Sequence, residues 1–153
     1  MKILIARRKA TSREQLVHLL WPEVSPAKGG NRLSVLLSTL RNVLAPHTNV
    51  VPLASNGSVV WLDRNQINVD VEKFLTGAVA ALFAHRSGQP DASERLKMAL
   101  AAYTGDFLAD DAAQDWATSL TEEVRVTHIA LLRALAARLR QTGDIDEATR
   151  YLV

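Results

Sequence analysis

The length and composition of the chain restrict the class of protein it can be. With 153 residues and a hydrophobic fraction of 48%, it suits one ordinary globular domain or two small ones, and it has no apolar run near the roughly 20 residues of a membrane span. Its lack of cysteine excludes disulfide scaffolds and thiolate metal ligands, and we expect a cytoplasmic protein with no membrane association.

The formal net charge of +2 conceals two parts of opposite sign. Residues 1–68 contain nine basic and three acidic residues, a charge of +6, whereas residues 69–153 contain nine basic and thirteen acidic residues, a charge of −4. A basic part followed by an acidic part predicts one half that binds a polyanion and one half that faces protein partners.

The first predicted elements are helices. Residues 1–6 are typical of the end of a helix. Thr11 and Ser12 each stand three residues before a Glu or Gln, the spacing of a capping box, so we expect both to cap the next helix. That helix ends before Pro22. Its predicted inward residues are Leu16, Leu19 and Leu20.

A second helix follows a short turn. Ser25 is its predicted cap and Pro26 its first residue, a position that favours proline. The pair Gly29-Gly30 lowers helix propensity by roughly 1 kcal/mol per residue relative to alanine. We therefore expect the regular helix to begin near Asn31 and to end at about Leu44.

The two faces of this second helix differ in kind. A core stripe at helical spacing consists of Leu33, Leu36, Leu37, Leu40 and Leu44. The other face has no acid; its residues are Lys28, Asn31, Arg32, Val35, Ser38, Thr39 and Asn42. A face that only keeps a helix in solution usually carries Glu and Lys in i,i+4 pairs. An acid-free face suits either contact with base edges and phosphates or packing against another helix.

Residues 50–63 predict a two-stranded β-hairpin. Two β-branched runs flank Asn56-Gly57, and this dipeptide tolerates the two positive φ angles that a type I′ turn requires. Because an isolated hairpin is only marginally stable, we expect it to pack on the helices or on further strands.

Helix, turn, helix and hairpin in this order predict a winged helix-turn-helix DNA-binding domain over residues 1–66. In such a domain the second helix lies in the major groove and the hairpin contacts the adjacent backbone. The predicted contacts to phosphate or guanine are Lys28 and Arg32, with Arg41 serving either phosphate or structure. Asn31, Ser38 and Asn42 are predicted to contact base edges, and Val35 or Thr39 a thymine methyl group. The residues predicted to place the wing are Ser55, Asn56 and Ser58.

Residues 67–153 predict an all-helical domain. Two predicted helices begin at Asp70 and Pro90, a third runs from about Ala113 to Gln141, and a fourth starts after Gly143. The predicted inward residues are Val71, Phe74, Leu75, Val79, Leu96, Leu100 and Tyr103. The last helix pair resembles a fragment of a tetratricopeptide (TPR) repeat, so the predicted fold is mainly α, with a TPR-like second domain.

Six stretches in a fixed order carry a resemblance to a known family: SREQLVHLLWPE, NRLSVLLSTLRNVL, INVDVEKF, ALAAYTGDFLADD, DWATSLTEEVR and GDIDEATRYL. They are similar to the SARP-type antibiotic-regulatory transcriptional activators, in which an OmpR-like winged helix precedes a bacterial transcriptional activation domain. Members of that family begin with a β-sheet and continue for several more helices. We therefore expect this chain to be truncated at both ends.

The resemblance implies a sequence-specific regulator that activates transcription. Family members bind direct repeats in double-stranded promoter DNA, commonly as homodimers, and recruit RNA polymerase. By match to the motif, the reading positions fall on Lys28 to Asn42 and the wing on Ser55 to Ser58. The helical domain is then the part that contacts proteins and sets the dimer geometry.

One alternative function stays open, and enzymatic chemistry is not expected. The alternative is a protein-interaction module whose truncated winged helix no longer reads DNA. No cofactor or metal is predicted, because the four histidines lack metal-ligand spacing; they are His18, His47, His85 and His128. The acids at Asp106, Asp110, Asp111 and Asp115 suit helix capping better than a cation site.

Overall fold

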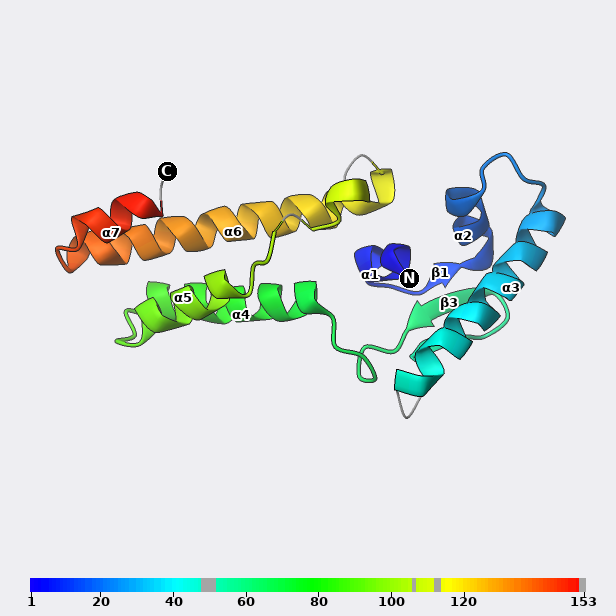
Figure 1. Cartoon of the computed structure of the whole chain (residues 1–153), viewed down its shortest axis with the longest axis horizontal. Helices are drawn as coiled ribbons and strands as arrows, with labels where there is room; N and C mark the ends of the chain where they lie inside the picture. Colours follow the sequence, from blue (N-terminus) through cyan, green and yellow to red (C-terminus); the bar gives the residue numbers. More distant parts are fainter. Residues whose placement is uncertain (48–51, 106, 112–113, 152–153) are drawn as a thin grey trace. The chain divides into compact units, whose positions relative to one another are not determined.

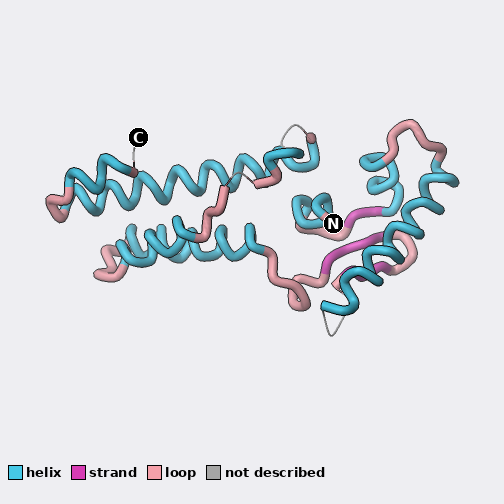
Figure 2. The backbone as a smooth tube through the Cα atoms, viewed as in Figure 1, coloured by secondary structure: helices cyan, strands magenta, loops and turns pink. Residues whose placement is uncertain are grey.

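The computed structural model describes residues 1–47, 52–105, 107–111 and 114–151, and it divides into two compact units, Met1–Val69 and Asp70–Val153. Both units are mainly helical, and a small sheet belongs to the first (Figures 1 and 2). The first unit contains α1 (Lys2–Arg7), β1 (Thr11–Ser12), α2 (Arg13–Leu20), α3 (Pro26–Leu44), the 3₁₀ helix η1 (Ala45–His47), β2 (Leu53–Ser55) and β3 (Val59–Leu62). The second contains α4 (Asp70–Arg86), α5 (Ala92–Ala101), the 3₁₀ helix η2 (Ala109–Asp111), α6 (Asp115–Gln141) and α7 (Ile145–Arg150).

One of the two predicted caps of α2 is confirmed. Ser12 is its N-cap, and the Ser12 hydroxyl accepts a hydrogen bond from the backbone N–H of Gln15 at 3.1 Å. The prediction for Thr11 is wrong, because Thr11 lies in β1 with 1% of its surface exposed, and its hydroxyl donates to the carbonyl of Lys9. The helix begins at Arg13, directly after Ser12, so Thr11 lies one residue too early to be its cap.

The helix α3 begins five residues earlier than predicted. It starts at Pro26 and passes through Gly29-Gly30 without interruption, with Ser25 as its N-cap residue. Gly29 is buried against α2, where a Cβ atom would overlap Cγ1 of Val17. The missing side chain lets the two helices approach closely, and this packing offsets the low helix propensity of glycine.

The sheet has a third strand that the sequence did not predict. Its strands are antiparallel in the order β1-β3-β2, with Thr11 opposite Val60 and Leu53 opposite Leu62. The strand β1 is only two residues long, and its Thr-Ser sequence is equally typical of a helix cap. Packing of the hairpin on a further strand and on α3 is as expected.

The hairpin turn differs from the predicted type I′ turn by one residue of register. Ser55 lies opposite Val60, and the backbone N–H of Asn56 donates to the carbonyl of Val59 at 3.2 Å, so Gly57 and Ser58 are the two central residues. Gly57 has φ +80°, whereas Asn56 and Ser58 have no positive φ. The turn therefore needs glycine at one position only.

The second unit is built on α4, α5 and α6, which pack against one another, while α7 packs on α6. The prediction that Val79 points inward is wrong: its side chain is 65% exposed, and Ala78 is buried instead. The helix α5 ends at Ala101, so Tyr103 lies in the following loop, where its ring stacks on His128 of α6 with centroids 3.8 Å apart. Alanine at the contact points permits close helix packing, which a ranking of positions by hydrophobicity does not detect.

Candidate nucleic-acid interface

The acid-free face of α3, defined by the seven residues from Lys28 to Asn42 named above, is exposed along its whole length. The opposite face holds Leu33 and Leu37, which are buried in the first unit. The side chain of Val35 is 68% exposed in the middle of the polar face, and Val43 is also exposed near its end. All seven predicted positions are exposed together, in line with the 3.6-residue period of the helix. The hydroxyl of Thr39 already donates a hydrogen bond within the helix, to the carbonyl of Val35 at 3.0 Å.

Arg41 ties α3 to the hairpin. Its Nε donates to the carbonyl of Leu53 at 3.1 Å, and its Nη2 donates to the hydroxyl of Ser55 at 2.8 Å. Of the two roles that the sequence left open for Arg41, these contacts favour the structural one. The same bonds occupy Ser55, so both residues act on the position of the hairpin relative to α3.

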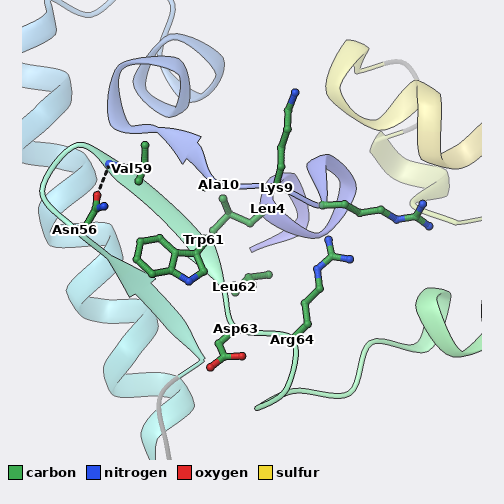
Figure 3. A pocket seen from close by; sticks show the side chains of 10 residues that line it. Leu4, Lys9, Ala10, Asn56, Val59, Trp61, Leu62, Asp63 and Arg64 are labelled. Carbon is green, nitrogen blue, oxygen red and sulfur yellow. Dashed lines mark hydrogen bonds between the residues drawn. The ribbon is translucent and has the colours of Figure 1, made fainter.

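The hairpin turn presents polar side chains beside α3, and some of its polar groups form hydrogen bonds within the turn. Asn56 and Ser58 are both exposed. The Oδ1 atom of Asn56 accepts from the backbone N–H of Val59 at 3.3 Å (Figure 3), and the carbonyl of Asn56 accepts from the N–H of Ser58 at 3.0 Å. The bond to Oδ1 fixes the orientation of the Asn56 side chain, and with it the direction of its NH₂ group.

Sequence reasoning missed Arg13, which connects three elements. Its backbone N–H donates to the carbonyl of Ser58 in the hairpin turn at 2.9 Å. Its Nη2 donates to the hydroxyl of Ser34 on α3 at 2.6 Å, and Ser34 in turn donates to the carbonyl of Gly30. Arg13 stands directly after the two predicted capping residues, and the sequence pattern predicts no contact for it. Its cationic side chain at the first position of α2 is the signal that was available.

The histidines and acids for which no chemistry was predicted are spread over both units. Among the described residues, no three His, Cys, Asp or Glu side chains are grouped as metal ligands would be. Asp111 lies in η2 and Asp115 opens α6, while Asp106 falls outside the described residues. No helix in the described ranges is both long enough and apolar enough to cross a membrane.

Comparison with known proteins identifies the second unit. The family model described as "Bacterial transcriptional activator domain" matches residues 69–153. No curated protein and no solved structure matches the chain. The match covers more than half of the sequence and begins one residue before α4.

Proposed function

Because the chain belongs to the bacterial transcriptional activator domain family, we propose that it regulates transcription by binding double-stranded promoter DNA through its first unit. In this proposal α2, α3 and the three-stranded sheet form a winged helix-turn-helix. The helix α3 enters the major groove, and the turn from Asn56 to Ser58 lies on the neighbouring backbone. The second unit, a TPR-like arrangement, contacts RNA polymerase and a second copy of the chain.

The observation that carries the proposal is the exposed, acid-free face of α3 with the hairpin bound beside it. Lys28 and Arg32 supply the positive charge that attracts phosphate, and the amides of Asn31 and Asn42 match the donor and acceptor pair of adenine. Val35, in the middle of this face, is exposed, so the face does not pack inside the first unit. The contacts of Arg13 and Arg41 hold helix and hairpin in one arrangement, as a reader of two adjacent DNA features requires.

Fluorescence anisotropy of the full chain with a pool of random duplex DNA tests the proposal. We expect binding that weakens as salt rises, since each phosphate contact contributes a slope of about −0.9 in log K against log salt. Arg32→Ala and Lys28→Ala should weaken binding to every duplex and flatten this slope. Arg140→Ala is the matched control, because it removes the same charge from an exposed position of α6.

A site selected from the pool then tests base reading. Asn31→Ala should cost about 1–3 kcal/mol at one base position and little elsewhere. Circular dichroism verifies that each variant is folded. If the folded chain does not bind duplex DNA at low salt, the proposal is wrong, and a protein-interaction module takes its place.

A further inference from the structure

The face of the sheet that points away from α3 carries a pocket of about 540 Å³. Ser55 and Val60 are direct partners, so their side chains share one face of the sheet, and on that face Ser55 meets Arg41 of α3. Successive side chains of a strand alternate between faces, so Val59 and Trp61 point to the opposite side, where they line the pocket. The pocket is therefore separate from the acid-free face of α3.

Cations from two segments of the chain surround this pocket. Arg8 and Lys9 lie between α1 and β1, and Arg64 follows β3. Figure 3 shows Arg64 directed toward α1 and Lys9 extending from the rim. Asp63 is the one carboxylate among the described residues of the lining, and its Oδ1 accepts from the backbone N–H of Asn65 at 3.0 Å. The lining thus has a formal charge of +2, which favours an anion.

The wall of the pocket is aromatic and apolar. The indole of Trp61 lies beside β3, and Leu4 of α1 and Ala10 just before β1 add apolar surface to the lining (Figure 3). Trp61 is half-buried, so part of its ring is open to a ligand. A planar ring gains by stacking on an indole, and the volume lies within the range of about 300–1,000 Å³ that small-molecule sites occupy.

We propose that this pocket binds a small anion that carries a planar ring. The ring lies against Trp61, and its phosphate or carboxylate group pairs with Lys9 and Arg64 in charge-assisted hydrogen bonds. This inference goes beyond the proposed function, because it uses neither α3 nor DNA. Its test therefore stands even if the chain does not bind a duplex.

The indole N–H signal of Trp61 in a ¹⁵N spectrum of the full chain reports on binding. The signal is assigned by its loss in Trp61→Phe. Four probes separate ring from charge: adenosine monophosphate, 1-naphthoate, adenosine and inorganic phosphate. We expect saturable shifts with the first two and binding at least about tenfold weaker with the last two, since each lacks one of the two interactions. The tighter of the two aromatic anions identifies phosphate or carboxylate as the preferred group.

Charge variants complete the test. Arg64→Gln and Lys9→Gln should each raise the Kd for the better probe about tenfold, whereas Lys28→Gln, which removes the same charge from α3, should leave it unchanged. In the DNA assay the order reverses, with Lys28→Gln weakened and Arg64→Gln unaffected. The inference is overturned if no aromatic anion shifts the Trp61 signal up to about 10 mM, if adenosine binds as tightly as its monophosphate, or if Lys28→Gln weakens ligand binding equally.

Discussion

At the scale of single residues, Gly29 determines how closely α2 approaches α3. Alanine normally stabilises a helix interior by about 1 kcal/mol relative to glycine. At this position its Cβ atom would overlap Cγ1 of Val17, which is buried and stiff because valine is β-branched. Gly30, the next residue, has open space around the same atom.

Two alanine substitutions should therefore act in opposite directions. Gly29→Ala should destabilise the first unit by about 1–3 kcal/mol, the usual cost of an overpacked core. Gly30→Ala should be neutral or stabilise it by up to about 1 kcal/mol. Urea unfolding followed by circular dichroism measures both. Equal effects of the two substitutions would mean that helix propensity, and not contact with Val17, governs this turn of α3.

Arg41 is the second residue whose role is decided by its contacts. Arg41→Met keeps most of the side-chain length and removes both donors to β2. We expect a loss of about 1 kcal/mol in stability and faster amide exchange in the hairpin. DNA binding should weaken at all sequences with an unchanged salt slope, because the arginine positions the hairpin and does not pair with phosphate. A flatter slope, as expected for Lys28→Ala, would assign Arg41 to the DNA backbone instead.

At the scale of elements, the hairpin shows how much of a turn a local sequence pattern can predict. Asn56-Gly57 correctly predicted a turn between two strands, but not which residues are central. The register is set by Leu53 and Val60, which are buried in the first unit. A shift of one residue would expose both, so the core overrides the local preference of the dipeptide.

This register predicts unequal sensitivity at the two positions of the dipeptide. Gly57→Ala should cost about 1–2 kcal/mol, because an L-residue is strained at φ +80°. Asn56→Gly should bring no gain, since Asn56 has no positive φ and loses its bond to the N–H of Val59. Thermal unfolding of both variants measures the difference. A stabilising Asn56→Gly would favour the type I′ register.

Other features of the fold are likewise determined either by the local sequence or by tertiary contacts. The Ser12 cap and the end of α6 at Gln141 follow from short-range signals, and both were predicted. The Gly143 N–H and the Asp144 N–H close α6 by bonding to the carbonyls of Arg140 and Leu139. In contrast, β1 and the contacts of Arg13 depend on partners more than 20 residues away, and no local pattern encodes them. For the candidate site, helical period predicted that the seven side chains of the acid-free face are exposed. The contacts of Arg41 and Asn56 depend on the tertiary structure and were not predicted.

At the scale of the whole molecule, charge and family membership point to a division of labour. The nine basic residues of the first 68 positions include every cation of the proposed DNA contacts and of the pocket beside Trp61. The acidic remainder coincides with the matched family domain. A negative second unit would repel DNA, so its contribution to function is expected through protein contacts.

Amide hydrogen exchange of the full chain with and without duplex DNA tests this division. DNA at 100 times its Kd stabilises the unit that binds it by about 2.7 kcal/mol, and exchange in α2, α3 and the sheet should slow accordingly. On a duplex short enough to hold one copy of the chain, amides of α4, α5 and α6 should keep their rates, because every proposed contact with DNA lies in the first unit. Equal slowing in both units would contradict this division, since it would require the free energy of DNA binding to stabilise the second unit as well.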